Sequence, residues 1–138
     1  MKKAILILSA SVALYASCKK DDNPTTPSQS GITGKWTIES THSKGISGGE
    51  LFDTTILGTP GEYVDVRSDG KAYSYQKGLY DTTSYKLLDN SRIVFLDEED
   101  PSASDTAQIK TLTKNSLVIY QKWVQGEDFT EVTQNLKK

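Results

Sequence analysis

Cysteine, histidine and arginine are scarce in this 138-residue chain: Cys18 and His42 stand alone, and Arg67 and Arg92 are the only arginines. A single cysteine excludes an intramolecular disulfide framework. Without a second histidine or another thiol, zinc ligation by histidine and cysteine is excluded. A net charge of −2 with scattered lysines gives no electrostatic basis for nucleic-acid binding. We expect no enzyme, no catalytic or metal site, no cofactor and no nucleic-acid partner.

Apolar residues are also few once their position is considered. They make up 36% of the chain, and 13 of these roughly 49 residues lie between Met1 and Cys18. The 108 residues from Gly31 to Lys138 contain only 36 of them. The chain therefore has room for one small, polar domain with a light core.

The first eighteen residues have the pattern of an export signal. Lys2 and Lys3 precede an uncharged, mostly apolar stretch, Ala4 to Leu14, which is too short to span a membrane. The sequence Leu-Tyr-Ala-Ser-Cys that ends at Cys18 resembles the lipobox of bacterial lipoproteins. That resemblance implies cleavage before Cys18, attachment of acyl chains to it and anchoring in a membrane.

The residues that follow Cys18 indicate a cellular location and a linker. Lys-Lys-Asp-Asp at 19–22 resembles the surface-export signal of Bacteroidota lipoproteins, which implies an outer-membrane lipoprotein displayed on the cell surface. A periplasm-facing protein with a solvated tether is the alternative. The polar, proline-containing stretch up to Gly31 cannot bury itself. We predict a signal peptide over 1–17, a lipidated linker over 18–31 and a folded domain over 32–138.

Turn-forming residues at nearly even spacing divide the domain into short strands, and no window shows a helical apolar period. The predicted strands are Lys35–Ser43, Glu62–Ser68, Lys71–Gln76, Asp81–Leu88, Arg92–Leu96, Thr106–Thr113, Ser116–Gln125 and Asp128–Leu136. Eight such strands avoid open edges by closing on themselves. We predict an all-β fold, an antiparallel eight-stranded up-and-down barrel. Its interior would suit packed side chains or one small ligand.

The first connection, Lys44 to Gly61, is the long one. It contains five glycines and a proline, and its apolar residues would either fold over the barrel mouth as a lid or form a helical turn that plugs the barrel.

Gly34-Lys35-Trp36 at the start of the first strand resembles the Gly-x-Trp motif of the lipocalins. The resemblance covers Ile32 to about Leu136 and implies a lipocalin-like barrel with Trp36 across its closed end. Lipocalins commonly place a late arginine against this tryptophan, and the chain has none there. Lys122 or Trp123 would then fill the space.

Turn geometry predicts which side chains face inward. Alternation from Trp36 places Ile38, Ser40 and His42 on its face. A two-residue Asp69-Gly70 loop, preferred because it segregates apolar residues, puts Val64, Val66, Tyr73 and Tyr75 together; a three-residue loop would pair Val66 with Ala72 and turn both tyrosines outward. An Asp89-Asn90-Ser91 turn groups Tyr85 and Leu87 with Ile93 and Phe95. A Gly126-Glu127 loop pairs Trp123 with Thr130 and Lys122 with Glu131.

The predicted lumen is aliphatic and aromatic, which suits a small apolar or aromatic ligand. Its candidate residues are Trp36, Ile38, Val64, Val66, Tyr73, Tyr75, Tyr85, Phe95, Ile119 and Trp123. The sequence thus favours a lipid-anchored, monomeric binding protein of the cell envelope. The alternative is a protein-interaction or inhibitor module with a filled barrel, which would use the long first connection.

Two further motifs are weaker. The acidic run Asp97 to Asp100 lacks the spacing and glycine of a calcium loop and is predicted to be a solvated loop. Asp-Thr pairs resemble the acceptor motif for O-glycosylation of exported Bacteroidota proteins. That resemblance implies sugar on Thr54, Thr82 and Thr106.

Overall fold

The computed structural model describes residues 29–96 and 104–138. A four-residue helix, α1 (Gln29–Ile32), precedes nine strands. These are β1 (Gly34–Ser47), β2 (Glu50–Leu57), β3 (Tyr63–Val66), β4 (Lys71–Gln76), β5 (Leu79–Leu87), β6 (Arg92–Leu96), β7 (Asp105–Leu112), β8 (Ser116–Gln125) and β9 (Asp128–Lys137). The signal peptide, Cys18, most of the predicted linker and the acidic run from Asp97 lie outside the described residues.

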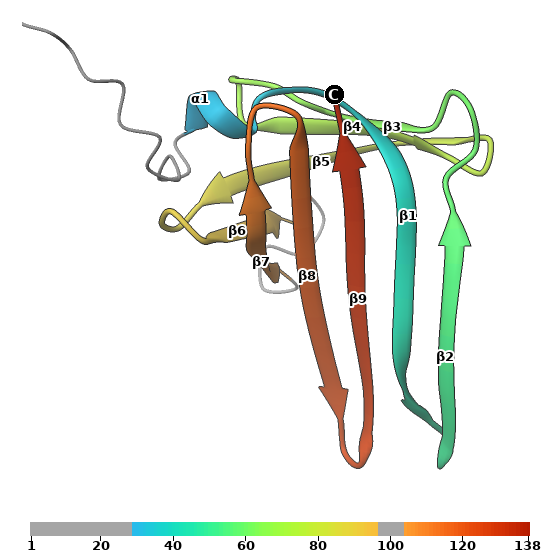
Figure 1. Ribbon diagram of the computed structural model, residues 1–138. Coiled ribbons are helices and arrows are strands. Elements are labelled where there is room, and N and C mark those ends of the chain that lie inside the picture. Colours follow the sequence, from blue (N-terminus) through green and yellow to red (C-terminus); the bar gives the residue numbers. More distant parts are fainter. Residues whose placement is uncertain (1–28, 97–103) are drawn as a thin grey trace, which may run out of the picture.

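Eight of the strands close into an antiparallel barrel. The sheet runs β1-β3-β4-β5-β6-β7-β8-β9, and β9 returns to pair with β1 over nine residue pairs. Strand β2 lies outside this ring and pairs with β1 (Figure 1). The predicted fold class is confirmed, and the barrel is consistent with a lipocalin-like fold.

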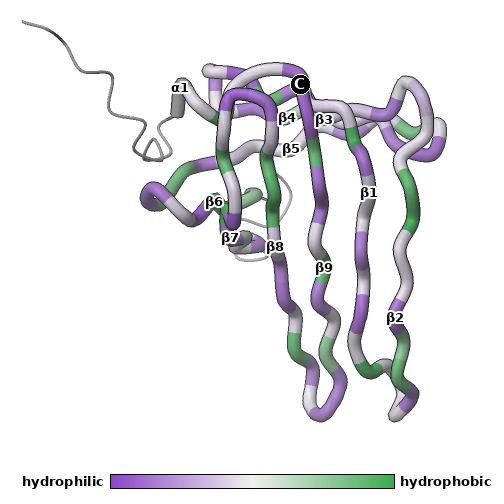
Figure 2. Tube along the Cα trace, viewed as in Figure 1, coloured by the Kyte–Doolittle hydropathy of each residue, from purple (hydrophilic) through white to green (hydrophobic). Residues whose placement is uncertain are grey.

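Four strands run far beyond the others. The far halves of β1, β2, β8 and β9 continue past β3–β7 as a sheet, which we call the extension (Figure 1). Within it β1 pairs with β2 on one side, from Ser40↔Leu57 to Ser47↔Glu50, and with β9 on the other. Apolar and polar residues are interspersed along these strands in Figure 2. Because successive side chains of a strand point to opposite faces, the extension has one face that continues the barrel interior and one outer face.

Two predicted hairpins are confirmed. Tyr85 pairs with Phe95 and Leu87 with Ile93, as the Asp89-Asn90-Ser91 turn requires. Lys122 pairs with Glu131 across the Gly126-Glu127 loop, and their side chains form an ion pair of 3.0 Å.

The preferred loop between β3 and β4 was wrong. Val66 pairs with Ala72 and Asp65 with Tyr73, so the loop has three residues and ends at Gly70 with φ +85°. The Arg67 N–H donates to the Lys71 carbonyl at 2.8 Å, which closes that longer loop. Because the register slips by one residue, Tyr73 and Tyr75 face outward.

The simple alternation along β1 was also wrong. Between Ile38 and Ser40 the register with β9 shifts, and Glu39 is the extra residue of a β-bulge. Beyond the bulge Thr41 pairs with Gln134, on the same face as buried Leu136. Ser40 and His42 therefore point outward, and Thr41 and Ser43 take the interior positions.

The long first connection is neither a lid nor a helical plug. Most of it forms the β1–β2 hairpin, which turns through Gly48 and Gly49 at φ +60° and +82°. Two positive φ values are the requirement of a tight two-residue hairpin turn, and glycine meets it without strain.

The closed end is built around Trp36, which is fully buried. Its indole Nε1 donates to the Ile32 carbonyl at 2.8 Å, so α1 caps the barrel here. Lys138 Nζ lies 4.3 Å from the indole ring centre and 2.9 Å from the Thr33 carbonyl. The basic residue against the tryptophan is therefore Lys138. Lys122 and Trp123, the residues predicted for that space, lie on the extension instead.

A pH dependence follows from the β5–β6 turn. Asp89 accepts hydrogen bonds from the Ser91 backbone N–H at 2.8 Å and from Arg92 Nε at 2.6 Å. These bonds, the backbone one foremost, lower the pKa of Asp89 from 3.8 to about 2. Because the ionised form is favoured in the folded state, its stabilising effect is complete above about pH 4 and is lost as the pH falls toward 2. Asp89→Asn should remove this part of the acid sensitivity in urea titrations between pH 5 and 2. An unchanged pH profile would contradict the assignment.

Gly45 is required by a close approach of β1 to β9. A Cβ placed on it would lie 1.9 Å from the Phe129 carbonyl oxygen. Gly45→Ala must push the strands apart, so we expect a loss of about 1–3 kcal/mol in unfolding free energy. Urea denaturation measures it, with exposed Lys44→Ala as the neighbouring control. Equal stability of the two variants would show that β1 and β9 can move apart without a loss of unfolding free energy.

Candidate functional site

Most of the predicted lumen residues meet inside the barrel. Trp36, Ile38, Val66, Tyr85 and Ile119 belong to one buried cluster, against which Val64 and Phe95 pack while half-buried. Tyr85 satisfies its phenol by donating to the Arg67 carbonyl at 2.8 Å. The cluster also includes Ile32, Ala72, Ile93, Ala107, Ile109, Leu117 and Leu136. The part of the lumen near Trp36 is thus occupied by side chains.

Three predicted lumen residues lie elsewhere. The Tyr73 ring is covered by the Arg67 guanidinium at 4.2 Å on the outer face. Tyr75 packs there against Tyr80 with the rings tilted by 36° and their centres 4.6 Å apart. Trp123, on the extension, is 38% exposed and donates from Nε1 to Asp105 Oδ1 at 3.0 Å. None of the three belongs to the buried cluster.

A cavity of about 250 Å³ opens where β3–β5 end and the extension begins. Its walls come from β1, β2, the β2–β3 connection and the β4–β5 turn. The lining residues are Ile38, Thr41, Ser43, Ile56, Leu57, Gly58, Thr59, Glu62, Gln76 and Lys77. Ile38 belongs to both the buried cluster and the cavity wall, so the cavity lies directly above the filled part of the barrel.

Glu62 holds the cavity's walls together. It is 9% exposed, and its carboxylate accepts from the Thr59 N–H at 2.9 Å and from the Lys77 N–H at 2.7 Å. These two backbone bonds, first that of Thr59, lower the pKa of Glu62. The ionised side chain thereby ties the β2–β3 connection to the β4–β5 turn. Both oxygens are in use, so we assign Glu62 a structural role.

The chemistry of the cavity is simple. Isoleucine and leucine side chains provide apolar contact, and the hydroxyls of Thr41 and Ser43 with the amide of Gln76 provide a few polar groups. Of the predicted lumen residues only Ile38 lines this cavity, and Ile56 and Leu57 come from the first connection, which was predicted to lie over the barrel mouth or to plug it. The bulge at Glu39 turns Thr41 and Ser43 toward the interior. No local sequence feature predicts that bulge.

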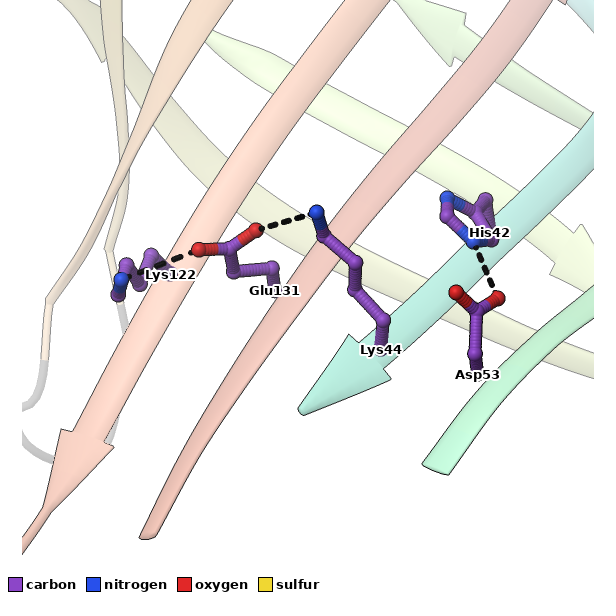
Figure 3. A network of polar contacts seen from close by, with 5 residues as sticks. All are labelled: His42, Lys44, Asp53, Lys122 and Glu131. Carbon is purple, nitrogen blue, oxygen red and sulfur yellow. Dashed lines mark hydrogen bonds and ion pairs between the residues drawn. The ribbon is translucent and has the colours of Figure 1, made fainter. Parts of the chain in front are cut away.

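A row of alternating charges crosses the outer face of the extension (Figure 3). Glu131 on β9 lies between Lys122 on β8 at 3.0 Å and Lys44 on β1 at 3.4 Å. The hydrogen bond from Lys122 is the main cause that lowers the pKa of Glu131. Asp53 on β2 meets His42 on β1 at 2.8 Å. His42 thus lies within a strand and contacts a carboxylate, away from the cavity.

The remaining candidate residues are exposed. Thr54, Thr82 and Thr106, the glycosylation candidates, are all accessible at the surface. Within 29–96 and 104–138, no group of three His, Cys, Asp or Glu side chains is placed to hold a metal ion. No helix in these same ranges has the length and apolar character needed to span a membrane.

Comparison with known proteins found no matching family, no similar curated protein and no similar solved structure.

Proposed function

We propose that this chain is a lipid-anchored binding protein of the cell envelope that takes a small apolar or aromatic ligand in the cavity beside Ile38. The observation that supports it most is the position of that cavity. It lies on the inner face of β1 and β2, directly above a barrel core that is already filled.

The size and lining of the cavity define the ligand class. About 250 Å³ is just below the usual range for small-molecule sites. Apolar walls with a few hydroxyl and amide groups favour a molecule the size of one or two rings that carries a hydrogen-bonding group. A cationic ligand is disfavoured, because the Glu62 carboxylate oxygens are both engaged by backbone donors and Lys77 also lines the cavity.

The membrane anchor is proposed from the sequence alone. The lipobox-like segment before Cys18 supports acylation at that residue, and the acidic pair Asp21 and Asp22 supports display on the outer surface. Each buried methylene contributes roughly 0.8 kcal/mol, so two or three acyl chains would hold the protein on the membrane permanently.

Mass spectrometry of the protein purified from its own membranes tests both parts. The denatured intact mass should equal the chain from Cys18 onward plus acyl groups, with any added sugar seen as a further increment. The native mass should show an additional small molecule that leaves on mild activation. An uncleaved, unacylated chain contradicts the anchor, and a native mass equal to the denatured mass contradicts the bound ligand.

A protein-interaction role is the second candidate, and the extension favours it. The β1–β2 and β8–β9 hairpins project beyond the barrel, with Leu51 82% and Val124 66% exposed. Deleting Ile46, Ser47, Glu50 and Leu51 shortens the β1–β2 tip but keeps the Gly48-Gly49 turn, now between Gly45 and Phe52, and it separates the two roles. It should abolish capture of an envelope partner under this candidate and leave small-ligand binding intact under the first.

A further inference from the structure

The outer edge of β2 is open along its whole length. Among the described residues, β2 pairs with β1 alone, and it stands at the end of the sheet (Figure 1). An exposed strand edge is a template for pairing with another strand. Near the core, barrel closure pairs both edges of the eight other strands. It leaves the outer edge of β2 unpaired.

The turn geometry shows which backbone groups this edge offers. In a two-residue hairpin the residues flanking the turn, Ser47 and Glu50, form a hydrogen-bonded pair, and such pairs then alternate along the strands. At the other end the Gly58 N–H donates to the Glu39 carbonyl at 2.9 Å, which gives the same alternation independently. The backbone groups of Leu51, Asp53, Thr55 and Leu57 therefore point away from β1.

The side chains along this edge are unusually apolar for a surface strand. Leu51 is 82% exposed, Leu57 73% and Ile56 49%. An edge protected against association would carry lysine, proline or a bulge, and β2 contains none of these.

We propose that two copies of this chain pair through their β2 edges in antiparallel orientation, about a two-fold axis at Thr54. This register places Asp53 opposite Thr55 and Leu51 opposite Leu57 of the second copy, and all four residues have outward backbone groups. On the other face Phe52 lies opposite Ile56. Each apolar side chain meets an apolar one, so the edge is complementary to itself, as a two-fold interface requires.

The two neighbouring registers that keep the backbone hydrogen bonds give less favourable side-chain pairs. An axis at Asp53 sets the two Asp53 carboxylates opposite each other, and like charges across a strand pair destabilise it. An axis at Thr55 sets Asp53 against Leu57. The edge of β2 therefore fits the β2 edge of a second copy, and it does so in one register. This dimer is independent of the proposed ligand and replaces the monomer expected from the sequence.

Cysteine crosslinking in the full chain tests the register. At a non-hydrogen-bonded antiparallel pair the Cα atoms lie about 4.5 Å apart, which is within the range of a disulfide. Thr54→Cys should give a covalent dimer on mild oxidation, whereas Thr55→Cys, the matched control one residue further, should give little because it faces residue 53. The parent chain, whose only cysteine is Cys18, sets the background. Adding Leu51→Lys and Leu57→Lys should lower the Thr54→Cys crosslink about tenfold, since two apolar pairs are lost and cations are set along the edge.

Light scattering on the unsubstituted chain in detergent provides a readout that no substitution can disturb. The proposal predicts a protein mass of two chains, with an intact mass showing Thr54 unmodified, because sugar at Thr54 would block the axis. A mass of one chain at micromolar concentration overturns it. So does crosslinking at residue 54 that is no greater than at residue 55, which is also the result expected if a different protein or the chain's own residues 1–28 cover the edge.

Discussion

Trp36→Ala should lower the unfolding free energy by about 3–5 kcal/mol, a large part of the stability of a domain this size. The indole is fully buried, and it packs in the cluster that joins α1 to the eight strands of the barrel. Its removal leaves a cavity and takes away the partner of the Ile32 carbonyl and of Lys138. The closed end of the barrel depends on this one side chain more than on any other.

Two further variants separate the causes. Trp36→Phe keeps most of the buried area and loses the Nε1 hydrogen bond, so it should cost about 1 kcal/mol beyond its smaller volume. Trp123→Ala removes the other tryptophan, which is partly exposed on the extension, and should cost about 1 kcal/mol or less. Urea titrations followed by circular dichroism give all three values. Similar losses for Trp36→Ala and Trp123→Ala would refute the special role of the closed end.

Thr41→Trp should weaken the binding of indole, used as a probe ligand, by more than about tenfold, or about 1.4 kcal/mol. Thr41 lines the cavity from the inner face of β1, so a tryptophan there would occupy the space that a one-ring or two-ring ligand needs. Isothermal titration calorimetry gives the affinity.

Thr55→Trp is the matched control for this prediction. Thr55 pairs with His42 on the outer face of the extension and is exposed, so the same change in size leaves the cavity open. It should bind indole like the parent chain. Equal binding by the parent and both variants would show that indole binds somewhere other than this cavity.

The hairpins with strong turn chemistry could be predicted from the sequence. Asp89 accepts bonds from Ser91 and Arg92 within the turn itself, so the register between β5 and β6 is a local property. Gly126 has φ +65°, and the β8–β9 pairing follows from that loop.

The errors arose where the outcome depends on contacts distant in sequence. Asp69-Gly70 fits a two-residue or a three-residue loop equally well, and burial of Val66 and Ala72 decides for the longer one. The bulge at Glu39 lets β1 pair with β3 near Trp36 and with β2 further on. Lys138 reaches Trp36 from the other end of the described chain, a contact that no spacing rule predicts.

Methyl NMR during an indole titration tests the proposed site most directly, because isoleucines mark each region of the protein. Ile38 and Ile56 line the cavity, Ile93 lies in the buried cluster, and Ile46 lies on the outer face of the extension. We predict saturable shifts of the Ile38 and Ile56 methyl signals at one common affinity, with Ile93 and Ile46 unchanged. Shifts at Ile46 or Ile93 without Ile38 and Ile56, or no saturable shift at all, would contradict a ligand site at this end of the barrel.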